Sequence, residues 1–347
     1  MKAAVYFGPE DVRIAEVPKP SPGPGEVLVR MKTSVICATD MKMFRGVHFQ
    51  VNNDQKVIFG HENTGIIDAI GEQVTGYEIG EAVFIAPNIG CGKCHLCVNG
   101  HNNMCQDVDH IGMTLNGGFA EYLLVPKLAV EQGNLIKLKQ GTDFAVAALA
   151  EPLGCVVRGQ KPLDIRPGKS VLIAGGGPIG MLHLKLAKLK GATKIIVSEP
   201  NLIRRERAIS FGADVVVDPI NEDLKKVVNG ETNNIGMDVI IVAVSVPQVQ
   251  AQAIDLAAIR GRICFFAGLP KDRPGPQIDS NAIHYKELVL TGSSGNSTAN
   301  DIEAMNIINS GKINMAEMIT GRYPLDKIHD AFIAAQQPET IKIAVEQ

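Results

Sequence analysis

Residues 171–180 read Val-Leu-Ile-Ala-Gly-Gly-Gly-Pro-Ile-Gly, and this stretch indicates the fold of the second half of the chain. Its four apolar residues are typical of a buried strand. The glycines that follow are spaced as Gly-x-Gly-x-x-Gly at the start of a predicted helix. Such glycines permit a tight turn, close approach of the backbone to a pyrophosphate, and close packing of helix on strand. The phosphates would lie at the N-terminus of the helix, where free N–H groups point outward. We therefore predict a dinucleotide site formed by Gly175, Gly177, Pro178, Ile179 and Gly180.

The residues after this loop alternate between helical and strand-like stretches. Helices are expected up to about Lys190 and through Phe211. Strand-like apolar runs recur at 194–199, 215–217, 239–242, 263–266 and 288–290. Strands that alternate with helices favour a parallel, doubly wound α/β sheet of the Rossmann type, which we assign to residues 156–298.

An acidic residue follows the glycine loop at the distance that dinucleotide sites use. Glu199 lies nineteen residues after Gly180, at the end of the second predicted strand. A carboxylate there can bond both ribose hydroxyls of NAD and would repel the 2′-phosphate of NADP. Arg204 and Arg205 follow, and they either hold a 2′-phosphate or form a solvated helix face. We predict NAD as the cofactor.

The first part of the chain reads as a mostly β domain. Residues 1 to about 138 alternate short apolar runs with Gly and Pro, for example at 26–30 and 81–85. This pattern predicts many short strands.

A candidate metal set lies within and just after this β region. Gly60-His61-Glu62 places two ligands side by side, Cys37 lies upstream, and Glu151 lies downstream in Glu151-Pro152. One nitrogen, one sulfur and one carboxylate make a catalytic zinc set, with a position open for water or substrate.

The run from Gly60 to Val74 resembles the zinc signature of the medium-chain, zinc-dependent alcohol dehydrogenases. The resemblance extends from Lys2 to about Val345. Glu151-Pro152 places the chain with the polyol branch (sorbitol, threonine and sugar-alcohol-phosphate dehydrogenases), because ethanol-type members have a cysteine at that position. The resemblance implies a GroES-like catalytic domain at residues 1–155, completed by 299–347. It also implies that zinc polarises the alcohol and that hydride passes to the nicotinamide.

The resemblance assigns roles to several residues. Cys37 and His61 are the first two zinc ligands, and the third is Glu151, which we rank slightly ahead, or Glu62. Glu151 could also be an ordinary acid at a helix start. Thr39 matches the Ser/Thr that bonds the substrate oxygen and starts a proton relay, while Asp40 would orient a ligand or its loop. Arg204 matches a residue that holds the adenosine end of the cofactor.

Four of the seven cysteines form a second metal signal. Cys91, Cys94, Cys97 and Cys105 lie within fifteen residues, among glycines that let the loop curl. Four thiolates can converge tetrahedrally on zinc and leave no position for substrate, so we predict a structural site and two zinc ions per chain. Disulfides or free thiols, and an iron–sulfur cluster, are the alternatives. Cys155 and Cys264 read as small core residues.

The sequence departs from the family at Lys42, where many members have a histidine that forms the outer proton relay. Lys42, Arg45 and His48 could give the pocket mouth a positive edge suited to a phosphorylated polyol. A solvated basic loop is the alternative.

Composition limits the remaining choices. The 347 residues carry a formal net charge of −3, with 45% hydrophobic and 20% charged residues, which gives no electrostatic reason to expect nucleic acid or membrane as partner. We expect a cytoplasmic protein, and the family resemblance implies a homodimer or homotetramer in which the run 288–290 could pair with a partner subunit. The predicted function is oxidation of a polyol or polyol phosphate. A threonine-type amino-alcohol dehydrogenase and a non-enzymatic, zinc-stabilised NAD-sensing protein are the alternatives. A zinc-free quinone reductase is disfavoured because such members lack the ligands.

Overall fold

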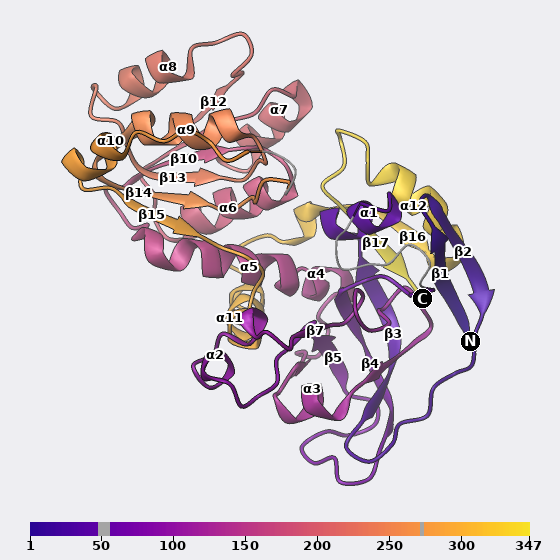
Figure 1. Cartoon of the computed structure of the whole chain (residues 1–347). Coiled ribbons are helices and arrows are strands. Elements are labelled where there is room, and N and C mark those ends of the chain that lie inside the picture. The colour runs from indigo at the N-terminus through magenta and orange to yellow at the C-terminus, as the bar shows by residue number, and fades with distance from the viewer. Residues whose placement is uncertain (48–55, 271–273) are drawn as a thin grey trace. The chain divides into compact units, whose positions relative to one another are not determined.

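In the computed structural model, the glycine-rich loop lies between a buried strand and a helix, as the sequence predicts. The structure describes residues 1–47, 56–270 and 274–347. They cluster into two units: unit 1 is Met1–Gly154 with Asn296–Gln347, and unit 2 is Cys155–Gly295. Each can be followed in Figure 1 by the residue-number colours.

Unit 2 is built on one parallel sheet of six strands. Its strand order is β12-β11-β10-β13-β14-β15, and all neighbouring pairs are parallel. This order reverses direction between β10 and β13, as in doubly wound dinucleotide-binding sheets. The strands are β10 (Ser170–Ala174), β11 (Lys194–Ser198), β12 (Val215–Val217), β13 (Met237–Val242), β14 (Ala257–Phe265) and β15 (Val289–Gly292).

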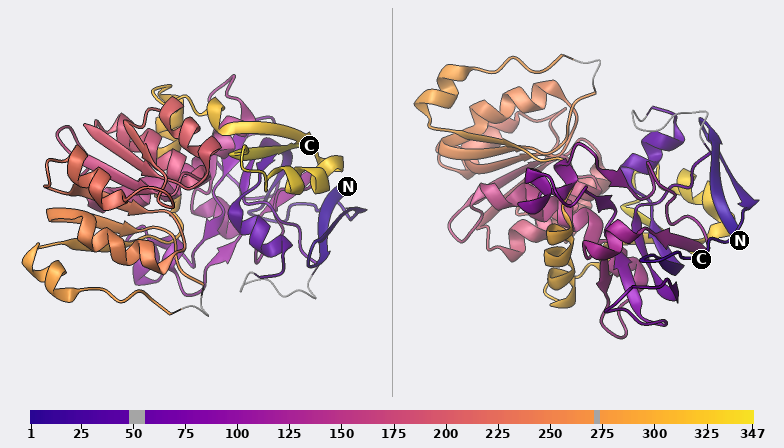
Figure 2. Two further views of the ribbon diagram at one scale, coloured as in Figure 1. Left: turned by 90° about the horizontal axis from the view of Figure 1, so that it is seen from above. Right: turned by 60° about the horizontal axis from the view of Figure 1, so that its bottom comes forward.

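Helices connect these strands and cover both faces of the sheet (Figures 1 and 2). They are α6 (Pro178–Leu189), α7 (Leu202–Ser210), α8 (Leu224–Glu231), α9 (Pro247–Leu256) and α10 (Ser280–Tyr285). The prediction of a Rossmann-type sheet is confirmed. One detail differs, because Leu288 precedes β15 and is buried in the core, so the exposed edge begins at Val289.

Unit 1 is mostly β. Its main sheet has the strand order β16-β17-β3-β4-β5-β9, with β8 paired to β3. Two short antiparallel pairs, β1-β2 and β6-β7, complete the strands. The strands are β1 (Lys2–Gly8), β2 (Asp11–Glu16), β3 (Val27–Val35), β4 (Glu62–Ile70), β5 (Ala82–Ile85), β6 (Asn88–Ile89), β7 (Asp109–His110), β8 (Tyr122–Val125), β9 (Leu135–Lys137), β16 (Ile319–Pro324) and β17 (Lys342–Glu346).

The C-terminal segment returns to unit 1, where β17 pairs antiparallel with β3. Both chain ends accordingly lie in this unit (Figure 2). The helices of unit 1 are α1 (Ala38–Phe44), α2 (His95–Val98), α3 (Lys127–Glu131), α4 (Phe144–Ala148), α11 (Thr298–Asn309) and α12 (Ile328–Ala334). Helix α5 (Ala150–Gln160) contains the division between the units. Among the described helices, none combines the length and the apolar character that a membrane span requires.

Candidate functional site

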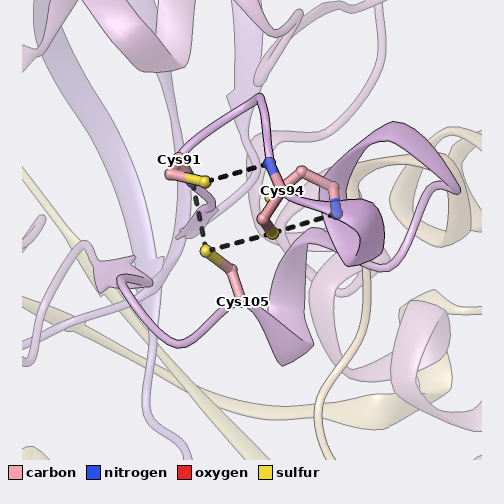
Figure 3. Close-up of side chains that lie close together, drawn as sticks. Cys91, Cys94 and Cys105 are labelled. Carbon is pink, nitrogen blue, oxygen red and sulfur yellow. Dashed lines mark hydrogen bonds between the residues drawn. The ribbon is translucent and has the colours of Figure 1, made fainter.

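The four clustered cysteines converge in unit 1, and their sulfur atoms all lie within 4.8 Å of one another. Figure 3 shows three of them, with the sulfurs of Cys94 and Cys105 3.8 Å apart. Zinc–sulfur bonds of about 2.3 Å in a tetrahedron place sulfurs about 3.8 Å apart, so the cluster fits zinc. None of the seven cysteines is in a disulfide.

Backbone amides prepare this loop for thiolates. The sulfur of Cys91 accepts from the amide of Cys94 at 3.4 Å, and the sulfur of Cys105 accepts from the amide of Cys91 at 3.3 Å. The amides of Lys93 and Cys94 lower the pKa of Cys91 to about 6, whereas burial raises the pKa of Cys97 to about 12. A cation among the sulfurs would favour the deprotonated form of all four.

Two glycines make the cysteine loop possible. A Cβ atom at Gly90 would lie 2.5 Å from the sulfur of Cys97, which is closer than real contacts allow. Gly100 has a φ of +78°, a conformation that L-residues avoid. His95, in the same loop, is exposed and is not one of the converging ligands.

Cys37, the first candidate ligand of the second site, is held at the N-terminus of α1. Its amide donates to Oδ2 of Asp40 at 2.8 Å, which is one half of a capping box. Asp40 is fully buried and also accepts from the amide of Gly60 at 3.3 Å. One carboxylate therefore ties the Cys37 turn to the loop that carries His61.

His61 and Glu62 lie beside Cys37. Each of the three residues offers a ligand atom within 4.8 Å of the other two. Nδ1 of His61 faces Asp40 Oδ1 at 3.3 Å, an ion pair when the ring is protonated, but it makes no hydrogen bond in the described structure. Burial opposes a charge on His61, but Asp40 and Cys37 outweigh it and raise its pKa well above the usual value.

Glu62 has a partner that the sequence analysis missed. Its Oε1 forms an ion pair with Nζ of Lys342 in β17, and both side chains are buried. Burial raises the pKa of Glu62 to about 7, although Lys342 lowers it. The available signal was a lone lysine inside the apolar run Ile341-Lys342-Ile343-Ala344-Val345.

Glu151 is close to this set but not part of it. It lies in the first turn of α5, is 7% exposed, and its charge raises the pKa of Glu62. Its oxygens are not among the mutually close ligand atoms found in the described residues. Asn296 fixes the backbone here by donating to the Glu151 carbonyl at 3.0 Å.

The glycine loop of unit 2 forms a tight turn at the N-terminus of α6. Gly175 has a φ of +108°, and a Cβ at Gly180 would lie 1.9 Å from the Gly175 carbonyl oxygen. A Cβ at Gly177 would meet nothing within 4 Å, so the space beside the α6 N-terminus is open. Pro178 and Ile179 form the first turn of that helix, with proline at a position where no amide is needed.

Glu199 is fixed beside this loop. Its Oε2 accepts from the amide of Gly176 at 2.7 Å and its Oε1 from the amide of Asn201 at 2.9 Å. Each oxygen keeps a lone pair for a further donor. Nη1 of Arg205 donates to the Glu199 carbonyl oxygen and forms an ion pair with Asp218. Nε of Arg204, in contrast, is buried without a hydrogen-bond partner in the described structure.

Thr39, the predicted start of the proton relay, is half-buried in the first turn of α1. Of the residues predicted to line the pocket mouth, Lys42 is exposed in the same helix. Arg45 is also exposed and donates from Nη2 to the side chain of Gln336 at 2.7 Å. His48 lies outside the described residues.

The other cysteines and one histidine occupy mainly structural positions. Cys264 is fully buried in β14, whereas Cys155 is only half-buried. His183 is buried in α6 against Phe266, and burial lowers its pKa to about 3.

Comparison with known proteins relates both units to one family of dehydrogenases. Residues 23–140 match the alcohol dehydrogenase GroES-like domain, and residues 178–310 match the zinc-binding dehydrogenase model. The chain is 35% identical to L-threonine 3-dehydrogenase of Pyrococcus horikoshii, covering 99% of this chain and 96% of the relative. It is 31% identical to sorbitol dehydrogenase of Halalkalibacterium halodurans, covering 99% and 98%. The fold matches a zinc-binding dehydrogenase of Sinorhizobium meliloti solved with NADP, with a TM-score of 0.91, 31% identity, and coverage of 100% and 99%. The chain therefore belongs to the zinc-dependent medium-chain alcohol dehydrogenase family of oxidoreductases.

Proposed function

We propose that this protein oxidises a secondary alcohol of a polyol or polyol phosphate to the ketone, with NAD as hydride acceptor. The observation that carries the proposal is the convergence of Cys37, His61 and Glu62 on one point in unit 1. Units 1 and 2 would then be the catalytic and the dinucleotide-binding domains, respectively. The non-enzymatic alternative has no use for such a three-ligand set.

The residues present fit a divalent cation. Sulfur, nitrogen and carboxylate oxygen are the donors that catalytic zinc takes. Oε2 of Glu62 is buried with no hydrogen-bond partner in the described structure, and a cation would satisfy it. When bound, zinc supplies a Lewis acid that lowers the pKa of the substrate hydroxyl. With the four-cysteine site, this makes two zinc ions per chain.

The chain's own residues then hold and orient the reactants. Asp40, which faces Nδ1 of His61 at 3.3 Å, would orient the ring, and the carboxylates of Glu62 and Glu151 would balance positive charge. The Thr39 hydroxyl would hydrogen-bond to the substrate oxygen and start the relay that carries the substrate's hydroxyl proton to solvent. Gly175 to Gly180 would receive the cofactor pyrophosphate, and Arg204 would hold its adenosine end.

NAD is proposed over NADP because the carboxylate of Glu199, fixed beside the glycine loop, would accept hydrogen bonds from the ribose hydroxyls and repel a 2′-phosphate. Replacing Glu199 with alanine should raise the KM for NAD about tenfold, because two hydrogen bonds to the ribose are lost. It should also reduce the difference in kcat/KM between NAD and NADP, because the carboxylate no longer repels the 2′-phosphate. The measurement is steady-state kinetics with both cofactors.

Glu199→Gln is the matched control. It retains one carbonyl oxygen for the loop amide but removes the negative charge, so it should relieve the discrimination against NADP with a smaller rise in the KM for NAD. An unmodified enzyme that already prefers NADP would refute the assignment of Glu199.

A panel of alcohols followed at the nicotinamide absorbance band tests the function. Sorbitol, other pentitols and hexitols, their phosphates and L-threonine are compared with NAD and with NADP. A secondary hydroxyl on a polyol should give the highest kcat/KM. A preference for L-threonine would establish the alternative, to which the relative from Pyrococcus horikoshii points.

A phosphate on the substrate should raise kcat/KM by about tenfold if Lys42 and Arg45 line the pocket mouth, because charge-assisted bonds to phosphate exceed neutral ones. Lys42→Ala or Arg45→Ala should remove most of that gain, and high salt should reduce it. Gln336→Ala is the control for Arg45, because it removes the Arg45 partner but no charge. An equal kcat/KM for the free polyol and its phosphate would refute this role and show that Lys42 and Arg45 belong to a solvated basic loop.

Assembly into a homodimer or homotetramer is proposed through the outer edge of the unit 2 sheet. Among the described strands, β15 pairs with β14 alone, and Val289 in β15 and Tyr285 at the end of α10 are exposed. A mass above the 37.1 kDa of one chain by light scattering is the expected result.

A further inference from the structure

Lys342 is a buried cation in a strand that otherwise buries apolar side chains. It is 3% exposed, and its Nζ donates to the carbonyl oxygen of Ile36 at 3.2 Å as well as to Glu62. Ile36 directly precedes the ligand Cys37. A lysine buried in this way is costly unless its charge is used, so its position beside the candidate ligands requires an explanation.

The two oxygens of Glu62 have different surroundings. Oε1 is bound to Lys342, whereas Oε2 is buried and has no hydrogen-bond partner in the described part of the chain. The same carboxylate offers a ligand atom within 4.8 Å of those of Cys37 and His61. Only one of the two oxygens is therefore free to meet a cation.

We propose that Lys342 is a positioning residue that retains Oε1 of Glu62, so that Glu62 can meet the metal with Oε2 alone. The inference rests on the metal site of the proposed function. A carboxylate that chelated with both oxygens would occupy the position that a catalytic zinc site must keep open for substrate. By holding one oxygen, Lys342 keeps that position available.

A role limited to charge balance is the competing explanation. Lys342 also lies within electrostatic reach of Cys37 and Glu151, so its charge offsets several acidic groups. Removal of the charge would strengthen metal binding under either explanation. The two differ in whether the number of ligand atoms changes, and in what happens when the charge is kept on a side chain of another shape.

Cobalt(II) reports on that difference. The metal-free protein is titrated with Co²⁺, and the visible spectrum of a His61→Gln variant, in which only the four-cysteine site is intact, is subtracted. The intensity of the remaining d–d bands distinguishes four-coordinate from five-coordinate cobalt, and the titration gives the affinity.

Lys342→Met and Lys342→Arg should act in opposite directions. In Lys342→Met, Glu62 is released to chelate, so the d–d intensity should fall at least about twofold, with about tenfold tighter Co²⁺ binding. In Lys342→Arg, the planar fork can hold both carboxylate oxygens, so Co²⁺ should bind about tenfold more weakly. An arginine variant that matches the unmodified protein, together with a methionine variant that keeps the unmodified spectrum, would overturn the proposal.

Further variants separate the possible failures. If Lys342→Met does not fold, the Glu62→Gln, Lys342→Met double variant removes both charges and should bind Co²⁺ about tenfold more weakly than the unmodified protein. If Glu62→Gln alone changes neither spectrum nor affinity, the role of Lys342 is refuted while the metal site of Cys37 and His61 stands. If His61→Gln has the spectrum of the unmodified protein, the proposed metal site itself fails.

Discussion

Replacement of Cys105 with serine should remove one zinc ion per chain and lower the melting temperature of unit 1 by about 10 °C. Loss of a bound metal is among the few single changes that lower the free energy of unfolding by roughly 4 kcal/mol or more. The melting temperature of a domain of this size falls by about 2–4 °C for each kcal/mol lost. Cys105 is 5% exposed, and its sulfur is a neighbour of both Cys91 and Cys94. Metal analysis and calorimetry measure the two effects, and surviving protein should keep some turnover because the catalytic set is separate.

His95→Ala is the matched control for this change. His95 lies in the same loop, is exposed, and is absent from the converging set found among the described residues. Zinc content and melting temperature should stay as in the unmodified protein. A Cys105→Ser protein that holds its full zinc and melts normally would contradict the structural role.

Replacement of His61 with glutamine should lower kcat/KM about 1000-fold or more and remove the second zinc ion. Lewis-acid stabilisation contributes several kcal/mol to the transition state, and each 1.4 kcal/mol is a factor of ten. The fold should persist because the four-cysteine loop is unchanged. Steady-state kinetics and metal analysis on one preparation provide the test, with NADH binding to unit 2 expected to remain.

His329→Gln serves as the control for His61. It is also a histidine of unit 1, but it is exposed on α12, with its ring against Phe44. Turnover and zinc content should be unaffected. Full activity in His61→Gln would exclude a metal-assisted mechanism at this position.

The Rossmann sheet could be predicted from the sequence because its signals are local. A run of apolar residues, a turn that needs glycines, and a following helix are all encoded within ten residues, and β10 and α6 appear where that stretch places them. The four-cysteine loop could be predicted for the same reason, because its ligands lie close along the chain and a short loop can bring them together.

The details of the candidate catalytic set depended on contacts between distant parts of the chain. The sequence analysis ranks Glu151 slightly ahead of Glu62 as the third ligand, whereas the structure groups Glu62, and not Glu151, with Cys37 and His61 among the described residues. The Glu62–Lys342 pair joins residues 280 positions apart, through the return of β17 to β3. Sequence patterns show which residues can bind a metal. Which oxygen of Glu62 pairs with a buried lysine, and which has no partner in the described structure, follows from the packing of strands that meet only when the chain folds, because burial and pairing set the cost of each charge.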